Sequence, residues 1–275
     1  MRRVVQRFLV CFFACLAWAG VSLAQDAILE RLDTGDDGRM WQAVGRIDIG
    51  GQGFCTGALI EPNLVLTAAH CLFDAQTGRR VDTQDVEFLA GWRNGRASAY
   101  RWVRRAIVHP DYQFSTKVDA TRVRNDIALL ELHHPIAKSG VVPFLTDDQP
   151  RRNDKIGLVS YARDRSEAPS LQKLCEVLQR QNGVLVMSCD VSYGSSGAPV
   201  FSFENGTPRI VSVVSAMAEV DGRKVALGAS LDEPLAKMRA ELSLTARHSE
   251  QAKSSFFSKG TDRNTGAKFA SPDTD

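Results

Sequence analysis

The spacing of hydrophobic and polar residues after position 40 predicts β-strands. Apolar residues alternate with polar ones or form short runs, and turn-forming residues separate these segments. A stretch rich in Pro, Asp and Arg at residues 143–154 divides them into two blocks, which favours an all-β fold of two small β-barrels. The expected strands are residues 43–49, 53–60, 63–72, 86–90, 100–108 and 126–132 in the first block and 155–162, 173–180, 183–190, 198–203, 209–217 and 224–230 in the second. The segment 63–72 is expected to run from a strand into a short helical turn.

The two blocks define the expected domains. Residues 41–145 form a first β-barrel and residues 146–244 a second. The second barrel ends in a helix expected at residues 232–243, where acidic residues and a proline come early and apolar residues follow at helical spacing. The polar residues 25–40 are expected to be a mobile lead-in, and the polar residues 245–275 a disordered tail.

The first 24 residues have the pattern of a secretory signal peptide. Arg2, Arg3 and Arg7 form a basic start, and an apolar run without a charge follows. Ser22 and Ala24 occupy the small-residue positions of a cleavage site after residue 24. The alternative is a membrane anchor, because the apolar run approaches the length of a membrane span. The signal-peptide interpretation predicts a secreted or periplasmic protein.

Charge and cysteine content narrow the classes of partner. Removing the signal removes three arginines and no acid, so the formal net charge changes from +2 to −1. A nearly neutral protein gives no reason to expect nucleic acid or anionic membranes as partners. No clustered His and Cys spacing suggests a metal, and no cofactor is expected. An even number of cysteines in an exported chain suggests two disulfides, formed from Cys55, Cys71, Cys175 and Cys189.

One pairing of these cysteines follows from a hairpin. Gln181-Asn182-Gly183 is a turn signal between two apolar runs. A hairpin centred on Asn182 places Cys175 opposite Cys189, at a Cα separation that a disulfide can bridge.

Three short segments carry candidate chemistry. In LTAAHC, His70 follows an apolar strand beside Cys71. In NDIALLEL, Asp126 stands among apolar neighbours and needs a cationic or N–H partner there. In GSSGAP, small residues leave a serine hydroxyl exposed; Gly194 permits a backbone that directs its own N–H beside that of Ser196, which makes Ser196 rather than Ser195 the candidate nucleophile. Each segment alone is also common in ordinary turns.

Together, in the order His, Asp, Ser, the segments resemble the chymotrypsin-like (trypsin-like) serine endopeptidases over about Trp41–Leu244. The resemblance implies two perpendicular six-stranded β-barrels with the catalytic groups between them. It implies that His70 is the general base, that Asp126 orients it, and that Ser196 attacks the scissile carbonyl of a protein or peptide. It also implies an oxyanion hole from the N–H groups of Gly194 and Ser196, and a Cys55–Cys71 disulfide beside the histidine.

Two departures from the animal members agree with each other. Ser195 stands where those members usually have Asp, and no Ile-Val-Gly-Gly start precedes Trp41. Both partners of the activation salt bridge are therefore missing, and the chain looks more like bacterial-type members, which include the glutamyl-endopeptidase-like branch.

Only a few residues of the sequence bear on substrate specificity. Asp190, six positions before Ser196, matches the residue that binds Arg or Lys in trypsin-like members. It is equally well an exposed residue at a strand end or one that supports the Cys189 hairpin. Ser215 matches the first residue of the substrate edge, and Met217 would narrow the pocket. No histidine follows His134 within the second block, which argues against acidic specificity.

Two other classes of function stay open at this point. One is a catalytically silent binding module on the same fold, and the other is a membrane-tethered or surface protein whose tail binds a partner. The favoured prediction is a monomeric exported endopeptidase, with a possible preference for Arg or Lys and no membrane association after removal of the signal.

Overall fold

The computed structural model describes residues 29–148, 150–204 and 206–244. The predicted signal peptide and the predicted disordered tail lie outside these residues. Within the described part of the chain, no helix is long and apolar enough to cross a bilayer.

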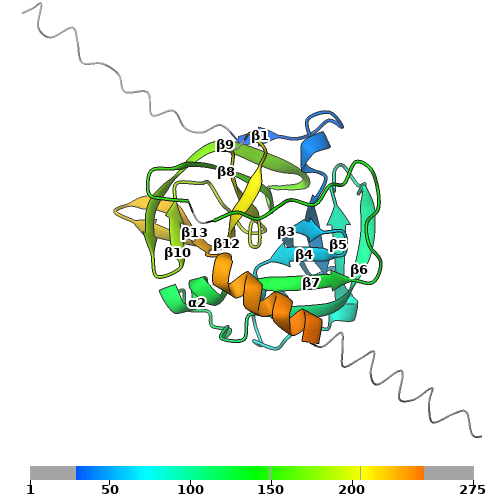
Figure 1. Cartoon of the computed structure of the whole chain (residues 1–275), viewed down its shortest axis with the longest axis horizontal. Coiled ribbons are helices and arrows are strands. Elements are labelled where there is room, and N and C mark those ends of the chain that lie inside the picture. The colour runs from blue at the N-terminus through cyan, green and yellow to red at the C-terminus, as the bar shows by residue number, and fades with distance from the viewer. Residues whose placement is uncertain (1–28, 149, 205, 245–275) are drawn as a thin grey trace, which may run out of the picture.

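The first barrel is a closed antiparallel sheet in the order β2-β3-β4-β7-β6-β5 (Figure 1). Every residue of β4 and β7 is buried, which explains why these segments are mostly apolar. The strands are β2 (Val44–Ile49), β3 (Gly53–Glu61), β4 (Leu64–Thr67), β5 (Val86–Ala90), β6 (Ala99–Val108) and β7 (Ala128–Leu132), and the connections include η3 (Ala69–Leu72), η4 (Thr83–Asp85) and α2 (Ala120–Asn125).

The second barrel closes through a pairing of β8 with β9, the two strands nearest the ends of the sheet order β1-β9-β10-β13-β12-β11-β8. Six of these strands form the barrel, so the prediction of two six-stranded antiparallel barrels is confirmed. They are β8 (Lys155–Ala162), β9 (Arg165–Gln181), β10 (Val184–Met187), β11 (Pro199–Ser202), β12 (Arg209–Val220) and β13 (Arg223–Ala229).

The segment expected to be a mobile lead-in contains ordered structure. Its strand β1 (Leu29–Arg31) pairs with β9 of the second barrel, and the next residue, Leu32, is buried. The short helix η2 (Arg39–Trp41) follows and buries Trp41. The expectation is therefore corrected for residues 29–40, because backbone pairing and apolar burial hold them in place.

Aromatic packing joins the two barrels. The Trp41 ring lies 5.0 Å from the Phe201 ring and 5.9 Å from the Phe144 ring, measured between centroids. Phe201 belongs to β11 of the second barrel, whereas Phe144 lies in the segment between the barrels. One apolar cluster therefore continues from the first barrel into the second.

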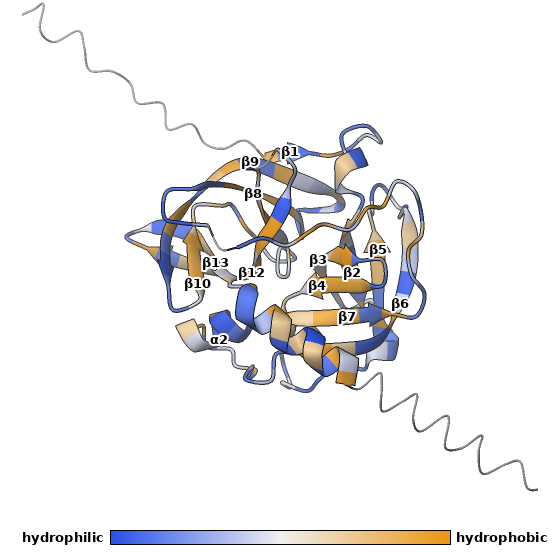
Figure 2. Cartoon of the chain, viewed as in Figure 1, coloured by the Kyte–Doolittle hydropathy of each residue, from blue (hydrophilic) through white to orange (hydrophobic). Residues whose placement is uncertain are grey.

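A C-terminal helix at residues 232–244 follows β13 and lies across the first barrel near β7 (Figure 1). Its hydropathy is mixed, whereas β3, β4 and β7 are mostly hydrophobic (Figure 2). Met238 is fully buried, and Arg239 forms an ion pair with Glu61 of β3 at 3.1 Å. The helix thus buries its apolar side against the barrels and keeps its charged side outward.

The predicted hairpin forms, with a different centre. Gln181 pairs with Val184, so the turn consists of Asn182 and Gly183, both with positive φ, as a two-residue hairpin turn requires. A bulge in β9 then shifts the register by one residue, which brings Cys175 opposite Cys189. Their Cα atoms are 5.0 Å apart and the disulfide is formed, as is the Cys55–Cys71 disulfide. The predicted pairing is confirmed, although the bulge, not a turn centred on Asn182, produces it.

We expect the double variant Cys175→Ala/Cys189→Ala to lower the free energy of unfolding by about 3 kcal/mol, because the disulfide closes a short loop in the unfolded chain. Denaturant titration of both proteins without reductant measures this difference. Wild-type protein treated with reductant serves as the comparison, and unfolding midpoints that coincide in all samples would contradict the expectation.

Candidate active site

His70 is held at the end of a buried strand. Strand β4 ends at Thr67, and the short helix η3 that follows carries His70 and Cys71. The disulfide from Cys71 to Cys55 fixes this turn against β3. The imidazole side chain is 19% exposed, so it is anchored on one side and reachable from solvent on the other.

Asp126 is positioned by the helix that precedes it. Asp119 caps the start of α2 by accepting a hydrogen bond from the backbone N–H of Arg122 at 2.8 Å. The helix ends at Asn125, Asp126 follows it, and Ile127 connects Asp126 to β7. The chain therefore directs the Asp126 carboxylate into the protein, where its side chain is fully buried.

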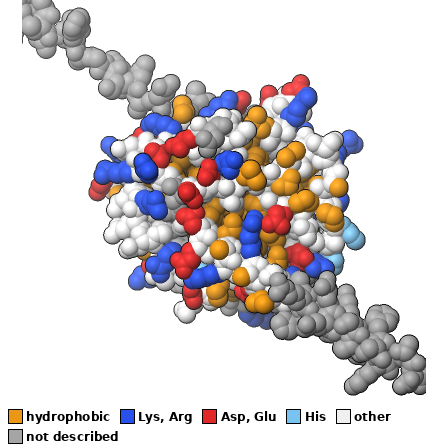
Figure 3. All heavy atoms as spheres, viewed as in Figure 1, with side chains coloured by type: hydrophobic (Ala, Val, Ile, Leu, Met, Phe, Trp, Pro, Cys, Tyr) orange, Lys and Arg blue, Asp and Glu red, His pale blue; other side chains and the backbone are white. Residues whose placement is uncertain are grey.

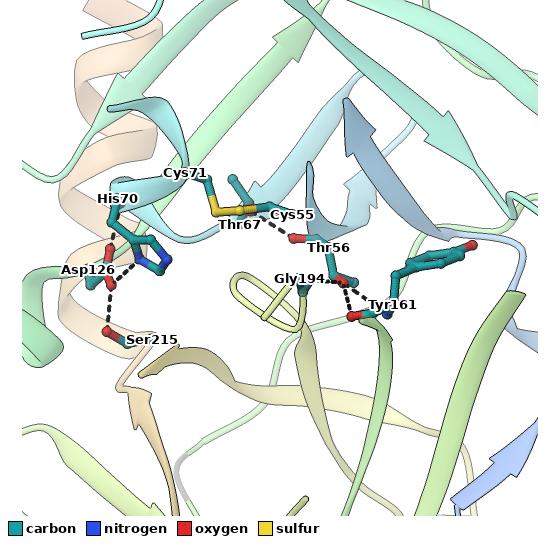
Figure 4. Close-up of a disulfide and its surroundings, with 9 residues drawn as sticks. All are labelled: Cys55, Thr56, Thr67, His70, Cys71, Asp126, Tyr161, Gly194 and Ser215. Atoms are coloured by element: carbon teal, nitrogen blue, oxygen red, sulfur yellow. Dashed lines mark hydrogen bonds and ion pairs between the residues drawn. A yellow bond between two sulfur atoms is a disulfide. The ribbon is translucent and has the colours of Figure 1, made fainter. Parts of the chain in front are cut away.

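Three hydrogen bonds satisfy the buried carboxylate (Figure 4). Its Oδ1 accepts from the backbone N–H of His70 at 2.8 Å. Its Oδ2 lies 2.6 Å from His70 Nδ1 and accepts from Ser215 Oγ at 2.5 Å. The carboxylate oxygens thus bind two groups of the first barrel and one hydroxyl of the second.

The electrostatic balance keeps Asp126 ionised. Burial alone would raise the pKa of this carboxyl, but the charge and hydrogen bonds of His70, with the hydroxyl of Ser215, outweigh burial and lower the pKa. An ionised carboxylate accepts the proton on His70 Nδ1, which leaves Nε2 of the ring as an acceptor. An imidazole held in this way can take a proton from a neighbouring hydroxyl.

The serine loop between β10 and β11 requires glycine on both sides of Ser196. Gly194 has a φ of +99° and Gly197 a φ of +77°, values that favour glycine. A Cβ atom at Gly194 would overlap the Phe54 ring, and one at Gly197 would overlap Thr67. The glycines therefore permit both the turn and its close approach to the first barrel.

The two adjacent serines differ in environment. Ser195 is fully buried, and its Oγ lies 3.3 Å from both Ser160 Oγ and the carbonyl oxygen of Tyr161. Ser196 is partly exposed, and its carbonyl oxygen accepts from the backbone N–H of Thr56 at 2.8 Å. In the described residues, no hydrogen bond joins Ser196 Oγ to the His70 ring. Only Ser196 of the two is reachable by a substrate.

The residues considered for specificity occupy unequal positions. Ser215 is buried, and its hydroxyl is committed to Asp126, so its side chain supports the histidine–aspartate pair. Asp190 is exposed just beyond β10, and its backbone N–H donates to Gln172 Oε1 at 2.8 Å. Met217 of β12 is 41% exposed. The position of the Asp190 side chain matches the strand-end alternative.

Within the described residues, one group of potential metal ligands lies close together, namely Cys55, His70 and Cys71. Both sulfur atoms belong to the disulfide and cannot act as thiolate ligands.

On the face shown in Figure 3, side chains of both charge signs are interspersed, in keeping with the small net charge.

Sequence reasoning missed two contributors to this site. The hydroxyl of Thr56 contacts the carbonyl oxygen of Gly194 at 2.9 Å, and the hydroxyl of Thr67 donates to the carbonyl oxygen of Thr56 at 2.9 Å. A threonine directly after Cys55 was visible in the sequence, but its partner lies 138 residues away.

We expect Asp126→Asn to flatten the pH dependence of stability in acid. The folded-state pKa of Asp126 lies below the usual value of about 3.9, so its ionised form stabilises the fold above that pH and this contribution is lost as pH falls through the folded-state pKa. Denaturant titrations between about pH 2 and pH 5 measure the slope. Wild-type protein measured in parallel is the reference, and an unchanged slope in Asp126→Asn would contradict the assignment.

Comparisons with known proteins agree with this geometry. The trypsin family model matches residues 33–225. Glandular kallikrein-10 of Rattus norvegicus is 28% identical over 229 residues, covering 79% of this chain and 78% of the kallikrein. Serine protease 23 of Mus musculus is 29% identical over 168 residues, covering 54% of this chain but only 42% of the relative, so the chain spans less than half of that protein.

A solved structure, described as Glu endopeptidase in complex with MPD, superimposes with a TM-score of 0.65 at 16% identity, over 79% of this chain and 97% of the other. This likeness shows a shared fold. The matched relatives include mammalian proteins, and the bacterial-type subgroup stays a prediction. The family model covers well over half of the sequence: the chain belongs to the trypsin family.

Proposed function

We propose that the protein is a serine endopeptidase that hydrolyses protein or peptide substrates through an acyl-enzyme. The observation that carries this proposal is the buried Asp126 carboxylate, which binds His70 twice, once at the backbone N–H and once at Nδ1 of the partly exposed ring. The accessible Ser196, on a glycine-built loop next to β3, supplies the nucleophile. Membership of the trypsin family supports the same conclusion.

The proposed reaction has two halves. Ser196 Oγ attacks the scissile carbonyl carbon while His70 Nε2 takes the hydroxyl proton, and the N–H groups of Gly194 and Ser196 stabilise the developing oxyanion. The tetrahedral intermediate then breaks its C–N bond as His70 returns the proton to the leaving amine. Water repeats the sequence on the acyl-enzyme and releases the acid product with Ser196 restored.

A catalytically silent binding module is the weaker candidate. Enclosing an ionised carboxylate costs several kcal/mol unless hydrogen bonds compensate, and a binding surface gains nothing from aiming that carboxylate at one imidazole. The Asp126 arrangement therefore favours catalysis. The two disulfides support an exported protein, and we place it in the secreted or periplasmic compartment.

We further propose that activation does not use a salt bridge from a new amino terminus. In this respect the protein would be like the bacterial-type members that the sequence resembles. Ser195 has no charge, and its hydroxyl contacts Ser160 and the carbonyl oxygen of Tyr161 instead. These neutral contacts require no chain cleavage to form.

We expect Ser196→Ala to lower peptide hydrolysis by several orders of magnitude and to abolish covalent labelling by a serine-reactive phosphonate, because the attacking oxygen is lost. Ser243→Ala, which changes an exposed hydroxyl of the C-terminal helix, serves as the matched control. Rates on a mixed peptide library and the mass of the labelled protein decide the result. Loss of labelling in Ser195→Ala but not in Ser196→Ala would show that Ser195, not Ser196, is the nucleophile.

The preference for Arg or Lys is a separate proposal that rests on Asp190. A bound cation would compensate the carboxylate, so Asp190→Ser should lower kcat/KM for Arg and Lys substrates more than for a Leu substrate. Both substrates are compared in wild-type and variant protein. Equal losses, or a wild-type preference for Phe, Leu or Glu, would leave Asp190 with a structural role only.

A further inference from the structure

Thr56 occupies the contact between the two barrels. It lies in β3 of the first barrel directly after Cys55, and it is fully buried. Its side chain faces β8 and the serine loop of the second barrel (Figure 4). A buried hydroxyl in such a place needs partners, and all of its partners belong to the second barrel.

The hydroxyl of Thr56 is fully used. It donates to the carbonyl oxygen of Gly194 at 2.9 Å and accepts from the backbone N–H of Tyr161 at 3.1 Å. The carbonyl oxygen of Tyr161 lies farther away, at 3.5 Å. The single hydroxyl proton is therefore directed at the carbonyl oxygen of Gly194. The hydroxyl oxygen is held in place by the backbone N–H of Tyr161 in β8.

The backbone of Thr56 makes two more connections. Its N–H donates to the carbonyl oxygen of Ser196 at 2.8 Å, and its carbonyl oxygen accepts from the hydroxyl of Thr67 at 2.9 Å. The preceding residue is bonded through Cys71 to the segment that carries His70. Thr56 thus contacts the serine loop on both sides of Ser195, and its neighbour Cys55 links it covalently to the segment that carries His70.

The carbonyl group that Thr56 binds has a particular place in this loop. The Gly194–Ser195 peptide lies between the two N–H groups proposed to form the oxyanion hole. Its carbonyl oxygen is bound by Thr56, and its N–H donates to the carbonyl oxygen of Ser192 at 2.9 Å. Gly194 is a flexible residue with positive φ, so the loop needs external contacts to keep this peptide in one orientation.

We propose that the Thr56 hydroxyl is a positioning group for the oxyanion hole: it fixes the Gly194–Ser195 peptide so that both flanking N–H groups point at the substrate carbonyl. The inference rests on the proposed function, because an oxyanion hole matters only if the protein catalyses acyl transfer. Thr56 acts through Gly194 and does not touch the substrate. Charged groups are not needed for this restraint, because both contacts of the hydroxyl are made to backbone groups.

The test compares Thr56→Val, which removes the hydroxyl at nearly constant shape, with Thr56→Ser, which keeps it. Ser212→Ala is the matched control, since the Ser212 hydroxyl is also buried and donates to a backbone carbonyl, that of Ala229, at 2.8 Å. Measurements are kcat and KM on one peptide substrate, the affinity for a peptide boronate that forms a tetrahedral adduct, and thermal unfolding of each variant.

Loss of an oxyanion donor itself lowers kcat by about 100- to 1000-fold, so loss of a group that only positions the donor should cost about 10- to 100-fold. We expect Thr56→Val to show this fall in kcat with KM nearly unchanged, and to lose boronate affinity in proportion. Thr56→Ser should remain within a few fold of wild type, as should Ser212→Ala.

The proposal is overturned if folded Thr56→Val keeps wild-type kcat, or if its loss appears only in KM. If the valine variant does not fold, Thr56→Ser decides: retained kcat supports the hydroxyl, whereas a loss above tenfold overturns it. A wild-type protein that neither cleaves peptide nor binds the boronate overturns the proposed function, and this inference with it. An active wild type with an unaffected Thr56→Val overturns this inference alone.

Discussion

A buried negative charge governs how the two barrels fit together. The Asp126 carboxylate is removed from water, and its ionisation is tolerable only because hydrogen bonds replace the lost hydration. Two of these bonds come from His70 in the same barrel, but the third comes from Ser215 in the other. Separation of the barrels would leave this carboxylate with an unfilled hydrogen-bonding site, so docking and charge compensation are one event.

The site combines rigid groups from the first barrel with a flexible loop from the second. The first barrel supplies strand-anchored groups, among them a histidine turn closed by a disulfide. The second barrel supplies a glycine loop that owes its shape to contacts with its surroundings, including those made by Thr56. Bonds between backbone and side chains of different barrels therefore replace the local rigidity that a loop of small residues lacks.

Local patterns predicted most of the fold, because strand periodicity and turn residues are properties of neighbouring positions. The Cys175–Cys189 pair was also predictable, although the turn is centred between Asn182 and Gly183 and not on Asn182. The bulge in β9 shifts the strand register by one residue and so restores the predicted pairing. Strand β1 escaped prediction because three residues are too few to show a period. The partners of Ser215 and Thr56 could not be inferred from neighbours, since each lies in the opposite barrel and depends on how the barrels dock.

The ends of the described chain are exchanged between the barrels. Strand β1, which precedes the first barrel, pairs with the second, and the helix at residues 232–244, which follows the second barrel, packs on the first. Each half of the molecule is consequently completed by a segment encoded beside the other half. During synthesis the first barrel emerges before the helix that covers it, so translation alone cannot finish either half in turn. Neither half has all of its native packing without a segment encoded beyond the other, so the two barrels make poor candidates for independent modules.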